Sequence, residues 1–290
     1  MAGGIYISLI IATLQDEGDL RLCLESLCQQ DHAPAFEVIL VDQNPAGYLD
    51  GMVQDYRTRL RLIHHHVDFQ GACRARNLGA DLAQGEWLGF PDDDCRLLPN
   101  TLALVEQFSR DLPDVKVITG RTVNDEGKSN VLRWSEQDRF FNRKNMFGSL
   151  TEATFFVHRA VFMAAGGFDT RFGPGSQFPA AEGVDLMNRI FSHIQVGQAY
   201  YNPGIMMLHP SKIPPWNRWA VARFHSYAIG DGALIAKSPQ PHILNWGFRT
   251  LVVAMIYMCS FRGWQSVAYG ARFIGLFRGF TSYLLRGVKR

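Results

Sequence analysis

The chain has 290 residues, of which 47% are hydrophobic and 19% are charged. This composition is typical of a folded protein with one large domain or two small ones, and it excludes a disordered or fibrous chain. The formal net charge of +2 conceals a segregation, because all 27 acids lie at or before Asp231, whereas residues 232–290 carry only basic charges. A basic segment after an acidic body favours an anionic partner, such as a membrane surface or a nucleic acid.

The cysteines indicate the redox compartment of the chain, and the lengths of its apolar runs indicate whether it has a signal peptide or a membrane anchor. The five cysteines form no CxxC pair and no zinc spacing with histidine, which indicates a reduced, cytosolic setting. The apolar run before Ala12 is too short for a signal peptide and has no preceding positive charge, so we expect a strand there. The longest apolar run of the basic segment, residues 250–261, is well below the ~20 residues that span a bilayer. We therefore expect no transmembrane anchor.

Strands and helices alternate along the first 90 residues. Apolar runs predict strands over residues 5–11, 36–41, 60–64 and 86–90, and helical spacing predicts helices over residues 18–29, 48–56 and 71–84. Further on, we predict a polar excursion over residues 121–150, a strand over 152–158 and helices over 159–165 and 181–191. This alternation indicates βαβ units with a parallel sheet, whose ligands bind beyond the carboxyl ends of the strands.

Three acids in a row, Asp92, Asp93 and Asp94, follow the strand predicted over residues 86–90. Adjacent negative charges repel, so a fold that holds them together usually offsets them with a divalent cation bound through oxygen. A solvated acidic turn would be the simpler interpretation of an isolated triplet. However, Asp42 follows the strand over residues 36–41, and acids at two strand ends would meet at one edge. No GxGxxG follows a strand and no GxxxxGK[ST] occurs, so a dinucleotide site or a P-loop has no support.

Five segments resemble the inverting GT-A glycosyltransferases of the large family 2 group, in the family's order. They are Ser8–Thr13, Val41–Asn44, Ala72–Gly79, Gly85–Asp94, and Gly166–Asp169 followed by Glu182–Leu186. The resemblance implies an α/β, Rossmann-like GT-A fold with a mostly parallel sheet flanked by helices, over residues 1–210. The nucleotide-sugar half would end at about residue 120 and the acceptor half would span residues 121–210.

The resemblance also implies a nucleotide-sugar donor, usually a UDP-sugar, and a Mn²⁺ or Mg²⁺ ion that bridges the protein and the diphosphate. The residues that it places at the donor are Ala12, Thr13, Asp42, Arg76, Asn77, Asp92 and Asp93. The residues that it places at the metal are Asp94, Asp92 and His209. Alternatively, Asp42 could only form a turn, Arg76 could pin the acidic loop, and His209 could be structural.

Inverting transfer needs a base that takes the proton of the attacking hydroxyl. The family pattern has a Glu-Asp pair at the start of the last predicted helix, and the Asp often serves as the base. In this sequence Gly183 replaces that Asp, so Glu182 is the first candidate and Asp185, on the same helical face, is the second. Both acids could instead only complement the positive end of the helix.

Aromatic and basic residues interleave after Trp216, and we expect residues 211–290 to form a helical, membrane-associating region. At 100° per residue, Arg272, Arg278, Arg286 and Lys289 share one helical face, opposite an aromatic and aliphatic face. This pattern is typical of an interfacial helix, although the helix could instead pack on the catalytic body. We expect residues 243–290 to bind an anionic membrane at its cytoplasmic, inner face. This location would suit a glycan acceptor linked to polyprenyl diphosphate, in cell-surface polysaccharide synthesis.

Two other functions stay open. A sugar nucleotidyltransferase needs a basic, Gly-rich loop after its first strand, but residues 13–19 contain no Lys or Arg. A degenerate glycosyltransferase that acts as a membrane-bound scaffold or binding subunit is consistent with Gly183. No RNA-recognition signature accompanies the basic residues, so we expect no nucleic acid partner.

Overall fold

The computed structural model describes residues 4–14, 17–210 and 215–286. It divides into two compact units. Unit 1 comprises Met1–Phe168 and Leu186–Ser211, and unit 2 comprises Asp169–Asp185 and Lys212–Arg290. Unit 2 is therefore built from two pieces of chain that are far apart in the sequence.

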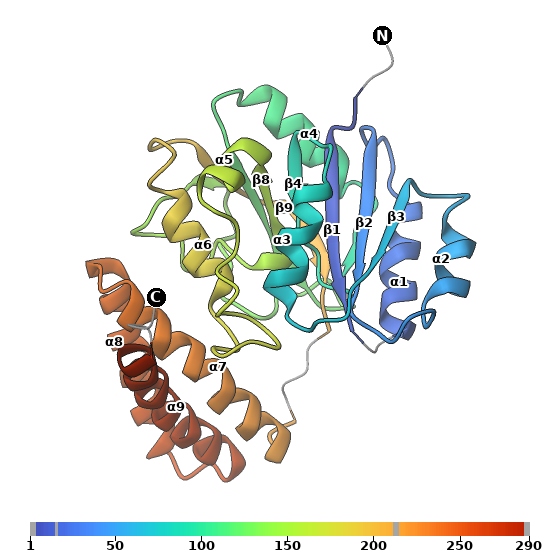
Figure 1. Ribbon diagram of the computed structural model, residues 1–290. Coiled ribbons are helices and arrows are strands. Elements are labelled where there is room, and N and C mark those ends of the chain that lie inside the picture. Colours follow the sequence, from blue (N-terminus) through green and yellow to red (C-terminus); the bar gives the residue numbers. More distant parts are fainter. Residues whose placement is uncertain (1–3, 15–16, 211–214, 287–290) are drawn as a thin grey trace. The chain divides into compact units, whose positions relative to one another are not determined.

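A mixed sheet forms the centre of unit 1 (Figure 1), with the strand order β3-β2-β1-β4-β8-β6-β9-β5 and with β7 paired to β9. Its strands are β1 (Ile7–Thr13), β2 (Phe36–Asp42), β3 (Leu62–His66), β4 (Trp87–Gly89), β5 (Arg96–Leu97), β6 (Val117–Val123), β7 (Arg139–Phe140), β8 (Phe155–His158) and β9 (Ala199–Leu208). The first four strands run parallel, as the alternating pattern predicts. The strand β8 is antiparallel to both of its neighbours, β4 and β6.

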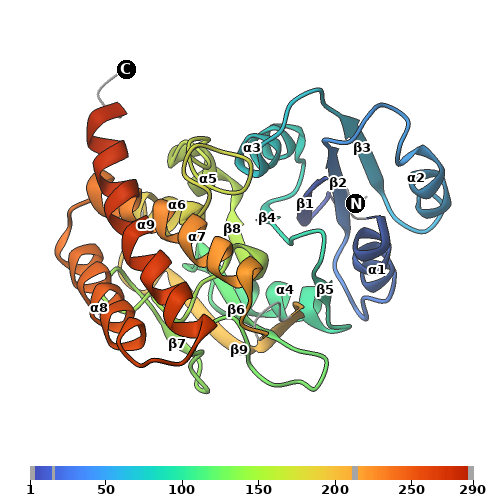
Figure 2. The same ribbon diagram turned by 90° about the horizontal axis from the view of Figure 1, so that it is seen from below.

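Helices cover both faces of this sheet. Figure 2 shows α3 (Ala72–Leu82) and α5 (Arg159–Ala164) on one side, and α1 (Glu17–Cys28) and α4 (Thr101–Asp111) on the other. The short helix α2 (Asp50–Tyr56) shares the apolar core of α1, and the 3-10 turn η1 (Glu152–Thr154) precedes β8. The α/β architecture inferred from the sequence is confirmed.

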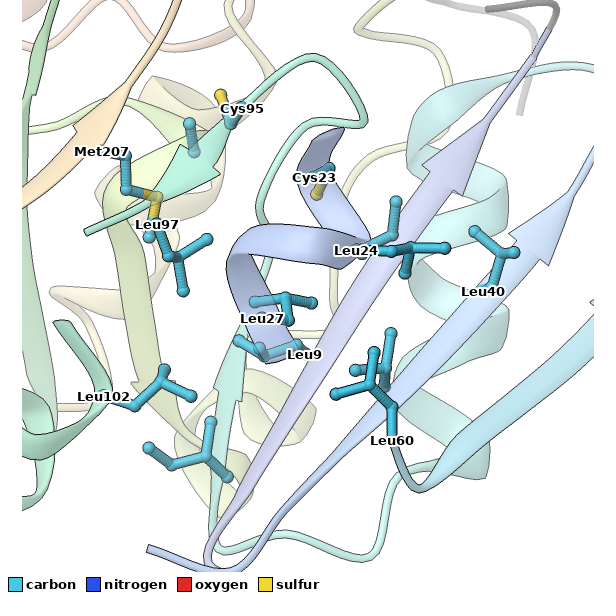
Figure 3. Close-up of a cluster of buried hydrophobic side chains, with 14 of the residues drawn as sticks. Leu9, Cys23, Leu24, Leu27, Leu40, Leu60, Cys95, Leu97, Leu102 and Met207 are labelled. Carbon is cyan, nitrogen blue, oxygen red and sulfur yellow. The ribbon is translucent and has the colours of Figure 1, made fainter. Parts of the chain in front are cut away.

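Successive side chains along each strand point to opposite faces of the sheet, so each face has an apolar core. Figure 3 shows Leu9 of β1 and Leu40 of β2 in one cluster with Leu24 and Leu27 of α1. On the other face, α3 lies so close to β1 that a Cβ at Gly79 would clash with Ile10. This close approach fixes α3, and the polar residues that it carries, beside the carboxyl edge of the sheet.

Three long helices, α7 (Arg218–Lys237), α8 (Pro241–Met258) and α9 (Trp264–Arg286), form unit 2 together with residues 169–185. The helix α6 (Glu182–Ile190) begins in unit 2 and ends in unit 1. The helices α7 and α9 pack backbone against backbone at Gly232 and Gly279. None of the helices in residues 4–14, 17–210 and 215–286 has the length and apolar character needed to cross a membrane.

The basic face predicted for the last helix is partly used inside unit 2. Arg272 pairs with Asp231 of α7, with 3.0 Å between its Nη2 atom and Oδ2, and Leu276 beside it is buried. Phe277 and Leu284 are more than half exposed. The packing face of α9 therefore includes one of its basic residues, and part of its apolar side is left open. The side chain of Arg286 and all of Lys289 lie outside the described residues.

Candidate active site

The carboxyl ends of four parallel strands meet at one edge of the sheet in unit 1. The strand register pairs Thr13 with Asp42, and Asp42 with His66. The strand β1 pairs with β2 on one side and with β4 on the other, and the acidic triplet follows β4. The acids that follow β2 and β4 therefore lie at the same edge of the sheet, with β1 between the two strands.

The three acids of the triplet have different surroundings. Asp92 is one-third exposed and pairs through Oδ1 with the guanidinium of Arg76. Burial, together with the charges of Asp92 and Asp94, raises the pKa of Asp93 to about 6, despite hydrogen bonds from Thr13 and the Leu14 backbone. Asp93 therefore faces the end of β1, whereas Asp92 contacts Arg76 of α3 and Asp94 lies near His209.

Four possible metal ligands gather beside the triplet. One ligand atom from each of Asp92, Asp94, Cys95 and His209 can be chosen so that all lie within 4.8 Å of one another. Nδ1 of His209 is 2.9 Å from the carbonyl oxygen of Pro210, which fixes the tautomer that presents the Nε2 lone pair. That Nε2 atom lies 3.9 Å from Oδ1 of Asp94. Carboxylate oxygens with one imidazole suit Mg²⁺ or Mn²⁺, so the residues present fit such an ion.

The two polar residues of α3 support the site from behind. Arg76 is buried, and its guanidinium lies 5.5 Å from the ring centre of Phe168. Asn77 donates to the carbonyl of Phe168 and accepts from its N–H, both at 2.8 Å. Gly167, at φ +65°, lies so close to Asn77 that a Cβ would stand 2.7 Å from its Oδ1 atom. The helix α3 therefore links the acidic triplet to the turn that ends at Phe168.

Asp42 lies at the end of β2, as expected, but it is fully buried. Its Oδ2 atom accepts a hydrogen bond from Nε2 of His64 at 2.9 Å. Its Oδ1 atom accepts two more from Asn44, one from the backbone N–H and one from the side-chain amide. The carboxylate thus fixes the turn after β2, and Asn44 and Gln43 are the residues that this turn presents.

A pocket of about 340 Å³ lies beyond the ends of β1, β2 and β3. It is lined by Leu14, Gln43, Asn44, Pro45, His66, Val67, Asp68, Phe69 and Gln70. Nε2 of His66 donates to the carbonyl of Asn44 at 2.8 Å, and Arg74 lies over the ring of Phe69 at 3.8 Å. Of these residues, the sequence analysis assigned none to the donor, and it likewise missed Cys95. His66 is the last of three consecutive histidines after Ile63, and this run of histidines was a signal that could have identified it.

A model of the family described as Glycosyl transferase family 2 matches residues 8–170, more than half of the chain. The chain belongs to glycosyl transferase family 2. This finding confirms the resemblance stated from the five sequence segments.

Relatives and solved structures agree with this membership. The family 2 chain is 31% identical over 173 residues to a PGL/p-HBAD biosynthesis glycosyltransferase of Mycobacterium bovis, which covers 58% of this chain and 62% of that relative. It thus spans less than two thirds of the length of that relative. The mannosyltransferase PcManGT of Pyrobaculum calidifontis, in complex with GDP-Man and Mn²⁺, has a TM-score of 0.66 at 18% identity, over 99% of this chain and 80% of that one. TarS 1–349 of S. aureus with UDP-GlcNAc has a TM-score of 0.57 at 17% identity, over 99% and 93%. These likenesses show the GT-A fold.

The acids expected as the base of this family 2 member lie in unit 2. Glu182 and Asp185 are in the first turn of α6, and both are buried. Oδ1 of Asp185 is 2.5 Å from Nζ of Lys237, at the end of α7. Lys237 was not singled out in the sequence, since nothing local connects it to a residue 52 positions earlier.

Proposed function

We propose that the chain is a metal-dependent inverting glycosyltransferase that moves a sugar from a nucleotide sugar, of the UDP-sugar class, to a hydroxyl of a glycan acceptor. The observation that carries this proposal is the ligand cluster of Asp92, Asp94 and His209 at the carboxyl edge of the parallel strands. Family membership supports the reaction type, and the complexes of TarS with UDP and UDP-GlcNAc support the donor class.

Asp92, Asp94 and His209 would hold Mn²⁺ or Mg²⁺. The ion would neutralise charge that grows on the departing diphosphate. The mannosyltransferase neighbour was solved with Mn²⁺, which supports the use of a divalent ion. Arg76, which is buried, orients Asp92 through their ion pair.

The pocket beyond β1, β2 and β3 would hold the nucleoside of the donor. Its walls offer the polar groups of Asn44 and Asp68 to a base or ribose, and the ring of Phe69 offers an apolar surface. The amide of Gln43 links Thr13 to Gly71 through hydrogen bonds at both of its ends. Ala12 and Thr13 would contribute backbone at the end of β1. Asp42 would act through Asn44, because both of its oxygens accept hydrogen bonds from within the protein. Asn77 would likewise act through the turn at Phe168.

Glu182 would take the proton from the attacking hydroxyl, with Asp185 as the second candidate. Glu182 opens α6 and is buried, and a carboxylate held out of water is the type of group that serves as a general base. Such a base typically contributes 10²- to 10⁴-fold to the rate. The scaffold alternative, which Gly183 leaves open, predicts that substitution of Glu182 leaves the function of the chain unchanged.

The acceptor would be linked to a lipid such as polyprenyl diphosphate, and the enzyme would bind peripherally to the inner face of the cell membrane. Large apolar side chains are exposed along α8 and α9, among them Phe248, Ile256 and Phe277. Exposed Arg249, Arg262 and Arg278 lie on the same two helices and the loop between them, and no acid follows Asp231. Apolar and basic residues together are the combination that binds an anionic membrane surface.

Calorimetry of nucleotide binding tests the proposal. The chain is titrated with UDP, GDP and dTDP, with Mn²⁺ and after chelation, in parallel with Asp94→Ala and with Asp125→Ala. Asp125 is an exposed acid that pairs with Arg96 and serves as the matched control. We expect one nucleotide to bind only with metal, to lose at least tenfold in affinity in Asp94→Ala, and to bind normally to Asp125→Ala. Absence of binding under every condition would refute the proposed donor site.

A further inference from the structure

A compact cluster of charges lies inside unit 2, at the end of α7. Nζ of Lys237 is 2.7 Å from Oδ2 of Asp169 and 2.5 Å from Oδ1 of Asp185. Arg171 also binds Asp169, with its Nη2 atom 2.7 Å from Oδ2. The side chain of Asp185 is 1% exposed and those of Asp169 and Lys237 are about one-sixth exposed. One ammonium group therefore serves two largely desolvated carboxylates.

Further contacts hold residues 169–185 against the same helices. Gly230 of α7 is so close to Ala180 that a Cβ would stand 2.5 Å from the Ala180 carbonyl oxygen. The ring of Tyr283 on α9 lies 5.6 Å from that of Phe178 and 5.3 Å from the guanidinium of Arg171. The segment that leads into α6 is thus fixed by α7 and α9.

The positive charges of this cluster lower the pKa of Asp169. Burial alone would raise the pKa of Asp169, but hydrogen bonds from Arg171 and Lys237 and the charge of Lys237 outweigh it, so that the pKa is lowered. Without Lys237, Asp169 and Asp185 would lose their shared counter-charge, and the pKa of Asp169 would be lowered less. The hydroxyl of Tyr283 on α9 lies 3.4 Å from Nη2 of Arg171 in this cluster, and Glu182 lies in the same first turn of α6 as Asp185.

We propose that Lys237 is a positioning residue for glycosyl transfer. Its ammonium group forms ion pairs with both Asp185 and Asp169 and thereby holds the first turn of α6. Glu182, and not Asp185, then takes the proton. This inference rests on the proposed glycosyltransferase function. A side chain of the C-terminal helices would then control a catalytic step without touching the substrate.

The test compares Lys237→Met, Lys237→Arg, Glu182→Gln and Asp185→Asn, with Arg272→Met as a matched control. Arg272→Met also removes an ion pair with an acid of α7, and the described ion-pair and ring partners of Arg272 are Asp231 and Phe224, both on α7. Hydrolysis of UDP-GlcNAc, UDP-Glc and GDP-Man is followed from pH 5 to 9. Urea unfolding from pH 3 to 7 and calorimetry with UDP and Mn²⁺ accompany it.

We expect Lys237→Met to lower kcat at least tenfold, to move the acid limb of the pH profile upward, and to leave donor KM within twofold. Lys237→Arg should restore part of kcat, and Arg272→Met should lower stability without moving the limb. Glu182→Gln should lower kcat more than a hundredfold, and Asp185→Asn should cost at least tenfold less than that. A merely structural Lys237 would change stability without changing the pH profile, and that result would overturn the inference.

Urea unfolding tests the ion pair of Lys237 with Asp169 even if none of the three donors is hydrolysed. The folded-state pKa of Asp169 is lowered, so its contribution to stability is present above its unfolded pKa of about 3.9 and is lost as pH falls below it. Lys237→Met should flatten this loss, and an unchanged pH dependence would refute the ion pair. Failure of the wild-type chain to bind UDP, GDP or dTDP with Mn²⁺ would instead refute the proposed donor site.

Discussion

Individual polar residues at the candidate site act mainly on neighbouring residues. The side-chain amide of Asn77 both donates to and accepts from the backbone of Phe168. Both carboxylate oxygens of Asp42 accept hydrogen bonds, one oxygen from His64 and the other from Asn44. Their positions at strand and helix ends could be predicted from the sequence. The partner of Asn77 could not, because a hydrogen bond between residues 91 positions apart leaves no local pattern, whereas the turn from Asp42 to Asn44 is local and was one of the alternatives.

Asn77→Asp tests the double hydrogen bond. The new carboxylate could still accept from the N–H of Phe168, but its second oxygen would oppose the carbonyl that the amide now contacts. We expect a loss of about 1–3 kcal/mol in the free energy of unfolding. Urea denaturation measures it, with Asn124→Asp as the control. Asn124 uses only its oxygen, which accepts from Glu126 and Lys128, so that change should be close to neutral. Equal effects of the two substitutions would contradict this assignment.

Among the helices, the pair α7 and α9 shows how small residues set packing. Gly279 of α9 lies against the backbone of Ile229, whereas Gly270 of the same helix has only ordinary contact with Met258, at 3.6 Å. Each Gly to Ala change gains up to about 1 kcal/mol in helix propensity. Only at Gly279 must the helices separate to make room.

We therefore expect opposite signs from two matched substitutions in α9. Gly279→Ala should lower the free energy of unfolding by about 1–3 kcal/mol, because overpacking outweighs propensity. Gly270→Ala should raise it by about 0.5–1 kcal/mol. Urea unfolding followed by circular dichroism measures both values. A stabilising Gly279→Ala would show that the helices are not in backbone contact there.

The elements predicted from the sequence match the structure where the pattern is local. The strands β1 to β4 and the helices α1 to α3 all occur within a few residues of their expected ends. The strand β6 was missed because Gly120 and Arg121 interrupt its apolar run. Gly120 is required there, since a Cβ would clash with the carbonyl of Ile205 on β9. The antiparallel direction of β8 is likewise fixed by strand pairing and has no local signature.

For the whole molecule, the segregation of charge gives a prediction about surfaces. Residues 232–290 carry eight basic residues and no acid, and α8 and α9 expose Phe248 and Ile256, both more than 60% exposed. We expect the chain to sediment with vesicles of phosphatidylglycerol and phosphatidylcholine, and to be released by salt. Each basic residue near an anionic surface contributes about 1 kcal/mol.

The double variant Phe248→Asp, Ile256→Asp should reduce vesicle binding at least tenfold. Val196→Asp, at a site that is 89% exposed in unit 1, is the matched control and should bind as the unchanged chain does. Pure phosphatidylcholine vesicles should bind weakly in every case. Equal binding of the double variant and the control would refute α8 as part of a membrane surface.

The interrupted path of unit 2 has a consequence for engineering chimeras. Residues 169–185 carry the partners of Lys237 and Tyr283, so this short piece and the C-terminal helices form one exchangeable module that is encoded in two places. A transplant of residues 212–290 alone into a relative would join helices to an unmatched loop. Domain exchange within the family should therefore cut the chain three times, after residues 168, 185 and 211.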